Sequence, residues 1–483
     1  MDPVFEFPLT LPSADSRGLL RALHAQLRAA ILDGRLKPGL RLPSTRGLAR
    51  AYRISRNTAI AAYDLLQSEG YVISHRGSGI YVATALPRRA EREMHPRGDA
   101  RSQRLASFWR TISPGFGMAP QLQLRHDFAL GVPDARLFPF AIWRRLAARA
   151  LRALAKEPAA YSAASGRAPL RDAIAHHVSF ARAVACAPED IVVTSGAQQA
   201  FDLLARILVT PGRTVVAIEN PGYPPQRTAF AAAGAKVVPV RVDAEGLVVQ
   251  SLPRDARVIC VTPSHQFPLG SAMSARRRAE LLDFARARGA VIVEDDYDGE
   301  FRFGGRPLDA LQTLDRNDCV FYVGTFSKSL FPAIRLGYIV SPPWARQALV
   351  AARQCSDWHS GVIEQDTLAA FIGEGHLVRH VRRMRSIYAA RRDVLLASLQ
   401  RDFGRWLQPI PNVAGLHLAA FTAPDIDVPG IVELARRDGV GIASLKRFYF
   451  GGRIRDGLIF GYGAIDERDI AEGCARLRRS WPK

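Results

Sequence analysis

The sequence predicts two structural units, a small helical unit closed by a β-hairpin and a larger α/β domain built on a mostly parallel sheet. Between residues 19 and 70, apolar residues recur at helical spacing, and two short β-rich runs follow. From about residue 126 onward, short β-branched runs alternate with helical stretches, as in βαβ units. Residues 83–125 carry Pro, Gly and Arg without sustained apolar periodicity, which is typical of a linker. We therefore expect domains at 1–82 and 126–483, the second ending in a small subdomain from about residue 345.

The composition of the chain is strongly basic. Its 483 residues include 66 Lys and Arg against 45 Asp and Glu, a net charge of +21, and only six of the 66 are Lys. Such a charge favours polyanions or phosphorylated ligands as partners. The five cysteines show no CxxC pair and no Cys/His ligand spacing, so neither a disulfide scaffold nor a metal site is expected. No apolar run approaches the roughly 20 residues that span a bilayer, and the opening MDPVFEFPLT lacks the pattern of a signal peptide. These features predict a cytoplasmic protein without a membrane segment.

The first unit is predicted to contain three helices. The first helix ends at Asp33-Gly34, the second covers residues 44–52, and the third runs from residue 55 to Gly70. Ser44 and Ser55 are the expected N-caps of the second and third helices. The apolar positions of the first helix are Leu19, Leu23, Leu27 and Ile31. Two helices joined by a tight turn, the second of them capped by Ser, form a helix-turn-helix arrangement.

A β-hairpin is expected directly after the third helix. Residues 71–73 and 80–82 flank the basic, glycine-containing segment HRGSG. This order predicts a winged helix-turn-helix, whose recognition helix enters the major groove of double-stranded DNA. The candidate DNA-binding residues are Ser44, Arg46, Ser55, Arg56, Asn57, Thr58, Arg76 and Gly77. The alternative is a small helical domain whose basic face is only solvated.

Five predicted strands of the larger domain each end in a polar cluster. The strands cover residues 191–193, 215–218, 258–261, 291–293 and 320–323, and they end in TSGAQ, ENPGY, TPSHQ, EDDY and GTFSK. In open α/β sheets, ligands bind just beyond the carboxyl ends of the strands. The sequence therefore predicts one site built from all five clusters.

One end of this site is suited to a phosphate. A helix that opens directly after a strand offers backbone N–H donors to an anion, and hydroxyl and guanidinium groups add further donors. The residues that provide these groups are Ser195, Gly196, Ala197, Thr325, Ser327 and Arg335.

The other end of the site is suited to an aromatic aldehyde. Tyr223 offers a flat face for stacking, and Asp295 is a carboxylate at the end of a buried strand, where it needs a cation such as a protonated ring nitrogen. Lys328 is the only Lys in the clusters, and unlike Arg it forms an imine with an aldehyde. Taken singly, each residue has an ordinary alternative explanation. Lys328 could be a surface charge, Asp295 could lie in a solvated turn, and Tyr223 could be an aromatic residue packed in a turn. Their joint placement in strand order predicts pyridoxal 5′-phosphate (PLP) as the cofactor.

Long sequence segments carry a resemblance to two known families. The segments YSAASGRAPLRDAIA, TSGAQQAFDLLARIL, ENPGYP, TPSHQFPLG, EDDYDGEFRF and GTFSKSLFPAIRLGYI resemble the fold-type I aminotransferase domain. The segments PGLRLPSTRGLA, SRNTAIAAYDLL and GYVISHRGSGIYV resemble the winged helices of GntR-type regulators. Together they resemble the MocR subfamily of GntR transcriptional regulators over nearly the whole chain. The resemblance implies a homodimer in which a PLP-binding, aminotransferase-like sensor is linked to an operator-binding domain.

The resemblance also implies roles for individual residues. Lys328 would be the lysine of the internal aldimine, Asp295 would pair with the pyridine nitrogen, Tyr297 would bond the ring hydroxyl, and Tyr223 would stack on the ring. Tyr161 matches a tyrosine that reaches the phosphate of the partner subunit. The residues expected to hold the phosphate are Ser195, Gly196, Ala197, Thr325, Ser327 and Arg335.

Two positions depart from the aminotransferase pattern. Phe267 stands where the enzymes carry Asn, although regulators of this subfamily share that change. Ile459 stands where the enzymes, and some regulators, place the Arg that binds the substrate carboxylate, while Arg453 and Arg455 lie close by in sequence. These departures favour a regulator that senses an amine, an amino acid or a PLP-related effector. The alternative is a working aminotransferase with a DNA-binding appendage, because Lys328 and Asp295 are both present.

Overall fold

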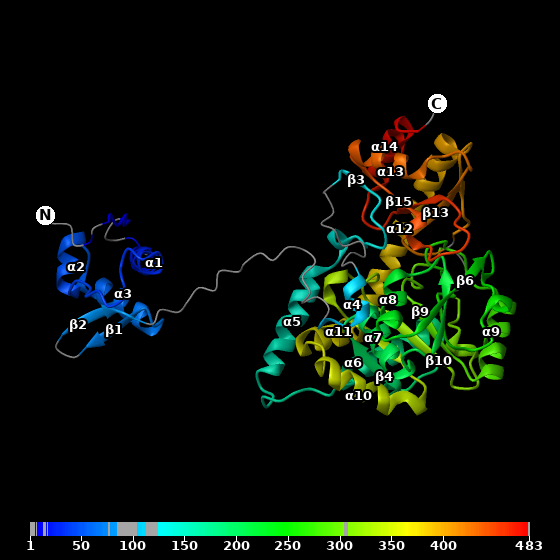
Figure 1. Ribbon diagram of the computed structural model, residues 1–483. Coiled ribbons are helices and arrows are strands. Elements are labelled where there is room, and N and C mark those ends of the chain that lie inside the picture. The colour runs from blue at the N-terminus through cyan, green and yellow to red at the C-terminus, as the bar shows by residue number, and fades with distance from the viewer. Residues whose placement is uncertain are drawn as a thin grey trace. The chain divides into compact units, whose positions relative to one another are not determined.

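The computed structural model describes residues 5, 7–12, 16, 18–75, 78–84, 104–112, 124–303, 308–412 and 414–481. The chain divides into two compact units, Met1–Ser102 and Gln103–Lys483 (Figure 1). No helix in the described ranges is long and apolar enough to cross a membrane.

The first unit contains the three predicted helices, α1 (Leu19–Leu32), α2 (Thr45–Tyr52) and α3 (Arg56–Ser68). Both predicted N-caps are confirmed, because the Ser44 hydroxyl accepts from Gly47 N at 3.1 Å and the Ser55 hydroxyl accepts from Thr58 N at 3.0 Å. The turn between α2 and α3 passes through Arg53, whose φ of 52° lies in the left-handed region. The helix-turn-helix geometry therefore follows from two serine caps and one tight turn.

A two-stranded hairpin closes this unit. β1 (Val72–His75) and β2 (Gly79–Val82) pair antiparallel, with His75 opposite Gly79. The predicted first-helix residues are confirmed as core, since Leu19, Leu23, Leu27 and Ile31 are all buried. They pack with residues of the other two helices and the hairpin, namely Leu48, Ala59, Ala62, Tyr63, Leu66, Val72 and Val82.

The larger unit is built on an eight-stranded sheet with the order β4-β11-β10-β9-β8-β5-β6-β7. Its strands are β4 (Ile191–Thr194), β5 (Val215–Asn220), β6 (Lys236–Asp243), β7 (Gly246–Leu247), β8 (Ala256–Val261), β9 (Val291–Asp296), β10 (Val320–Thr325) and β11 (Gly337–Val340). All five predicted strands are present, and the mostly parallel sheet is confirmed. Among the strands that the structure describes in this sheet, β11 and β7 are the two that run antiparallel to their neighbours, and neither had been predicted.

Alternate strand residues pack on opposite faces of this sheet. Val216, Val258 and Val293 contact an apolar layer that includes residues of α7 (Ala197–Leu208), α8 (Pro224–Ala232) and α10 (Arg346–Asp357). On the other face, strand residues pack with α6 (Ala168–Arg182), α9 (Ala275–Arg288), α11 (Val362–Gly373) and α12 (His376–Phe403). Burial on both faces explains why the strands are continuous apolar runs rather than alternating ones.

A smaller sheet carries the C-terminal part of the chain. It has the order β12-β13-β16-β15, and helices α13 (Val428–Arg437) and α14 (Glu467–Arg479) accompany it (Figure 1). Its strands are β12 (Leu407–Pro409), β13 (His417–Thr422), β15 (Ala443–Ser444) and β16 (Gly457–Gly461). Beside it, β3 (His126–Asp127) pairs in parallel with β14 (Val440–Gly441), so the segment around residue 126 lies next to the C-terminal part of the larger unit. Within the predicted linker, residues Ser107–Thr111 form a short helix, α4.

Candidate functional site

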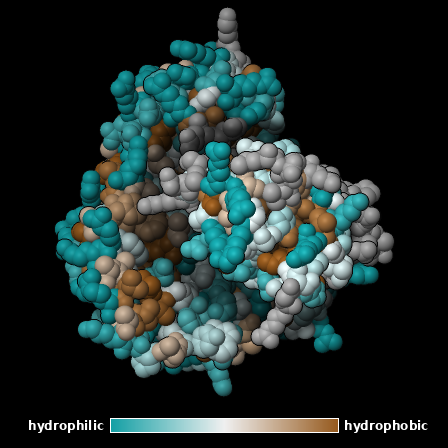
Figure 2. Space-filling view, turned by 90° about the vertical axis from the view of Figure 1, so that its left-hand side faces the viewer, coloured by the Kyte–Doolittle hydropathy of each residue, from teal (hydrophilic) through white to brown (hydrophobic). Residues whose placement is uncertain are grey.

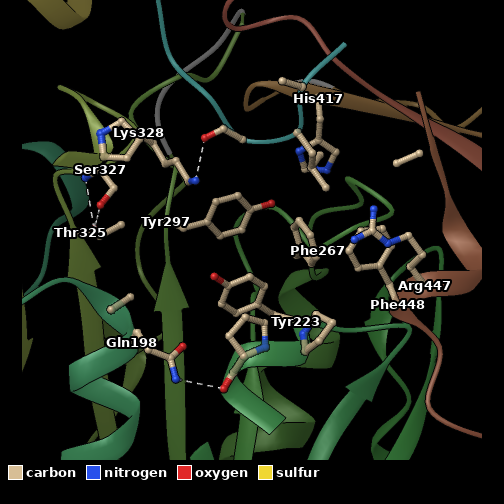
Figure 3. Close-up of a pocket in the computed structure, with 18 of the residues that line it drawn as sticks. Gln198, Tyr223, Phe267, Tyr297, Thr325, Ser327, Lys328, His417, Arg447 and Phe448 are labelled. Carbon is tan, nitrogen blue, oxygen red and sulfur yellow. Dashed lines mark hydrogen bonds between the residues drawn. The ribbon is translucent and has the colours of Figure 1, made fainter. Parts of the chain in front are cut away.

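A cavity of about 410 Å³ lies beyond the carboxyl ends of β9 and β10, where the sequence predicted the site (Figure 3). Its walls come from the large sheet, from the start of α7, from residues 127–131 and from residues 441–448. Eight predicted site residues line it, namely Ala197, Tyr223, Asp295, Tyr297, Thr325, Ser327, Lys328 and Arg335, and Phe267 lines it as well. The polar ends of strands far apart in sequence are therefore brought to one cavity.

Lys328 lies three residues after the end of β10, and its side chain projects into the cavity (Figure 3). Its Nζ donates a hydrogen bond to the Gly131 carbonyl at 2.7 Å. Gly131 has a φ of +67°, and a Cβ at this position would lie 2.8 Å from the lysine Nζ, so glycine allows the close approach. Burial lowers the pKa of Lys328, although Asp298 and Asp295 act in the opposite direction. A neutral amine at this position is a nucleophile toward an aldehyde.

Asp295 is a buried carboxylate that forms no ion pair with any described residue, although the charge of Lys328 acts to lower its pKa. It is 4% exposed, and its Oδ1 has no hydrogen-bond partner among the described residues. Burial, together with the negative charges of Asp296, Asp298 and Glu219, raises its pKa well above the usual range. Such an orphaned buried oxygen fits a cationic ring nitrogen that donates to it.

The predicted anion end of the site is assembled at the start of α7. Gly196 has a φ of +81°, and a Cβ there would lie 3.0 Å from two nitrogens of the Arg335 guanidinium. Arg335 donates from Nη2 to the Ser195 carbonyl at 2.5 Å. Thr325 Oγ1 accepts from Ser327 N at 3.2 Å, so both hydroxyls face the same end of the cavity. Helix N–H groups, two hydroxyls and a guanidinium are donors of the kind that bind an anion such as phosphate.

Aromatic and histidine side chains form the middle of the cavity (Figure 3). The Tyr223 and Phe267 rings meet edge to face with centroids 5.4 Å apart. The Tyr297 hydroxyl lies 2.9 Å from His265 Nδ1, and His265 Nδ1 is 3.0 Å from both oxygens of the buried Asp298. The ring hydroxyl of Tyr297 is thus held by a buried histidine–carboxylate pair.

Three predicted residues do not line this cavity: Ser195 and Gly196, which lie directly before α7 beside Arg335, and Tyr161. Tyr161 is 76% exposed, does not line the cavity, and packs on Trp358 with ring centroids 4.4 Å apart. Other large apolar side chains are exposed on helices of the same region, including Phe140, Leu151 and Phe180. Figure 2, which looks onto the side where α5 (Phe140–Leu154) lies in Figure 1, shows apolar residues gathered on this surface of the larger unit.

Several cavity residues were missed by sequence reasoning. Residues 127–131 and 441–443 reach the cavity through the β3–β14 pairing, and no local motif indicates that contact. His417 lines the cavity at the start of β13, and burial lowers its pKa well below the usual range. The ligand-type atoms of His265, Asp298 and His417 lie within 4.8 Å of one another, a grouping that the sequence had not predicted. Arg447 and Phe448 complete the wall.

The candidate DNA-binding residues of the first unit lie at the exposed N-termini of α2 and α3. Ser44, Arg46, Ser55, Arg56 and Asn57 are exposed, and Thr58 is half-buried. Arg76 and Gly77 lie outside the described residues. Arg41, which had not been predicted, is exposed and lies against Gly79 of the hairpin.

Comparisons with known proteins agree with both units. Residues 126–455 match the aminotransferase class I and II family, and residues 19–82 match the bacterial regulatory proteins of the gntR family. The chain is 39% identical to the probable rhizopine catabolism regulatory protein MocR of Rhizobium meliloti, over 95% of this chain and 93% of that protein. It is 32% identical to the HTH-type pyridoxine biosynthesis transcriptional regulator PdxR of Corynebacterium glutamicum, over 96% of each.

The fold of the larger unit is also found in solved structures. LysN, the α-aminoadipate aminotransferase of Thermus thermophilus in complex with N-(5′-phosphopyridoxyl)-L-leucine, matches with a TM-score of 0.72 and 28% identity. That match covers 79% of this chain and 98% of LysN. The two units together define a DNA-binding transcriptional regulator with an aminotransferase-like domain. The chain belongs to the MocR-type GntR regulators.

Proposed function

We propose that the cavity of the larger unit binds PLP. Lys328 would meet its aldehyde, Asp295 its ring nitrogen, Tyr297 its ring hydroxyl and Tyr223 its ring face. The residues that would hold its phosphate are Ser195, Gly196, Ala197, Thr325, Ser327 and Arg335. When bound, PLP supplies an aldehyde that condenses with amines and a ring that accepts electrons. The observation that carries this proposal is the orphaned, buried Asp295 oxygen in one cavity with the only lysine of the clusters.

The residues of this chain divide the work of such a site. The lowered pKa of Lys328 keeps a share of its amine neutral, which is the reactive form. Asp295 stabilises a protonated ring nitrogen, since a cation removes the cost of its buried charge. The His265–Asp298 pair orients the Tyr297 hydroxyl.

We further propose that the cofactor makes this domain a sensor of an amine or amino-acid effector. Residues 1–82 would bind operator DNA, residues 83–125 would link the domains, and residues 126–483 would sense the effector, with a small subdomain from about residue 345. Arg56, Asn57 and Thr58 would meet phosphates and base edges from the start of the recognition helix, and Arg76 would contact the DNA from the hairpin. Ser44, Arg46, Ser55 and Gly77 complete the proposed DNA-binding set. Two copies would read two half-sites, as symmetric dimers do.

The dimer would also explain the exposed surface near α5. Tyr161, Phe180 and Trp358 are large side chains left accessible in one chain, and exposed apolar patches of this kind mark interaction surfaces. In the dimer, Tyr161 would reach the phosphate site of the partner subunit. A protein that stays monomeric at all concentrations would contradict this arrangement.

The function is tested by titrating operator DNA with and without an amine effector, on wild type and on Lys328→Ala. We expect the effector to change the DNA affinity of wild type by about 5- to 150-fold, the usual range of coupling between sites, and to leave Lys328→Ala unchanged. An equal effect on both proteins would show that the domain senses without covalent exchange at Lys328.

A working aminotransferase is the second candidate, favoured by the joint presence of Lys328 and Asp295 in the cavity. A multi-turnover assay with an amino donor and 2-oxoglutarate separates the two functions. Sustained turnover would show that the protein is a working aminotransferase. A single turnover at most would support the function of a regulator.

A further inference from the structure

Among the described residues, five charged side chains line the cavity, and the proposed cofactor site uses three of them, Asp295, Lys328 and Arg335. The other two, Asp127 and Arg447, make no hydrogen bond or ion pair through their side chains with any described residue. Charged groups on a cavity wall that lack a partner are available to a ligand. Arg447 is therefore a guanidinium without an assigned function at the mouth of the cavity (Figure 3).

The segment that carries Arg447 is fixed in place by packing. Arg447 belongs to the 3₁₀ turn η8 (Leu445–Phe448). Leu445 is fully buried and packs with Leu269, Ala419 and Ile459. The start of the turn is therefore anchored in the apolar core of the smaller sheet.

The same segment is tied to the loop that carries Tyr223. Gly222 N donates to the Phe448 carbonyl at 3.0 Å, and Phe450 N donates to Asn220 Oδ1 at 2.8 Å. Asn220 Nδ2 donates in turn to the Gly451 carbonyl at 3.1 Å. These bonds hold the Arg447 backbone against the aromatic wall of the cavity, so the point from which its side chain extends is fixed before any ligand enters.

Ile459, which stands where the aminotransferases carry an Arg, supplies no charge to the cavity. Ile459 lies in β16, is fully buried in the apolar cluster with Leu445, and does not line the cavity. Any recognition of an anionic group on the side away from the proposed phosphate site must come from another residue. Arg447 is the cation that lines the cavity there within the described part of the chain.

We propose that Arg447 binds the anionic group of the effector, so that the effector is an amine that carries a carboxylate. Its amino group would point toward Lys328 and its carboxylate toward Arg447. This inference rests on the proposed function, because it takes Lys328 and the cofactor as the amine-binding end. An Arg–carboxylate pair forms charge-assisted, often bidentate hydrogen bonds, which make it selective as well as strong.

The test uses the full-length, cofactor-loaded protein and compounds matched in length. Propylamine, butylamine and pentylamine are each compared with the α-amino acid, the ω-amino acid and the diamine of the same carbon number, and the cofactor absorbance band reports binding. We expect an amino acid to bind at least about 10-fold more tightly than the matched alkylamine for one or more lengths, the worth of a hydrogen bond to a charged group. Arg447→Gln should remove this preference while the cofactor band and alkylamine binding persist, and Arg447→Lys should keep part of it. Arg453→Gln is the control, because Arg453 is exposed on the same segment and does not line the cavity.

The other outcomes separate this inference from the function on which it rests. Equal binding of alkylamines and amino acids, or a preference that survives in Arg447→Gln, would overturn the role of Arg447 and leave the cofactor site intact. Tightest binding of diamines would assign selection to Asp127 and would also overturn it. A wild-type protein that shows no cofactor band would overturn the proposed function itself.

Discussion

Two neighbouring aspartates at the end of β9 should respond in opposite ways to the same substitution. Asp295 has an oxygen without a partner and a pKa that burial raises well above the usual range. Asp296 instead accepts hydrogen bonds from Arg182 Nε at 2.6 Å and from the Tyr322 hydroxyl at 2.7 Å. Both carboxylates are buried, so their partners alone set the expected difference.

In the cofactor-free protein, Asp295→Asn should raise the free energy of unfolding. Because the pKa is higher in the folded state, the folded protein holds a proton that the unfolded protein releases, and stability falls as pH rises above about 4. Between the unfolded and the folded pKa of Asp295, the free energy of unfolding falls by about 1.4 kcal/mol for each pH unit. From pH 4 to pH 7 the loss is therefore at most about 4 kcal/mol. Asparagine does not titrate, so the gain should be near zero at pH 4 and should grow with pH, to at most about 4 kcal/mol at pH 7.

With the cofactor bound, the same substitution should be harmful. Removing one partner of a buried ion pair costs about 3–5 kcal/mol, which corresponds to a cofactor affinity weakened by about 150- to 5000-fold. Asp296→Asn is the matched control, because it leaves Arg182 with an uncompensated charge and should destabilise both forms by about 3–5 kcal/mol without a comparable loss of cofactor affinity. Urea unfolding across pH 4–8 and absorbance titration with PLP measure the two quantities. An Asp295→Asn protein that is less stable without cofactor, or that binds cofactor like wild type, would refute the assignment of Asp295 to the ring nitrogen.

Three further predictions concern single residues. Lys328→Ala should remove the cofactor absorbance band, and borohydride should attach no pyridoxyl group to the variant. Lys236 is exposed, so Lys236→Ala should behave as wild type. Labelling of another lysine would contradict the assignment of Lys328. Arg56→Gln should lower the slope of log K for operator DNA against log salt by about one unit, as expected for one lost phosphate contact, while Arg21→Gln on α1 should leave the slope unchanged. Ser55→Ala removes the hydroxyl that accepts from Thr58 N, so amide exchange should report an α3 destabilised by about 1 kcal/mol, and Ser74→Ala should leave α3 protected as in wild type.

The parts of the structure that the sequence predicts are those determined by local rules. The five strands are recognisable because burial on both faces requires continuous β-branched runs. The starts of α2 and α3 are recognisable because a serine N-cap precedes each helix. The cavity follows from the same logic, since parallel strands place their carboxyl ends at one edge. β11 was not predicted. It is only four residues long, and it covers the end of the segment GTFSKSLFPAIRLGYI, which was interpreted as a phosphate-binding motif.

The contacts that were not predicted join residues far apart in the chain. They connect the cavity to the segment that follows the predicted linker. β3 begins directly after the predicted linker, pairs with β14, and leads within a few residues to Gly131, whose carbonyl accepts from Lys328 Nζ at 2.7 Å. An amine that forms an imine with an aldehyde keeps at most one N–H hydrogen, so a link between Lys328 and a cofactor would alter its hydrogen bond to Gly131. Each change in the bonding of Lys328 therefore changes what holds residue 131. The first segment past the predicted linker is in this way part of the wall of the cavity, and under the proposed function it would give the effector a short covalent path from the cavity to the linker.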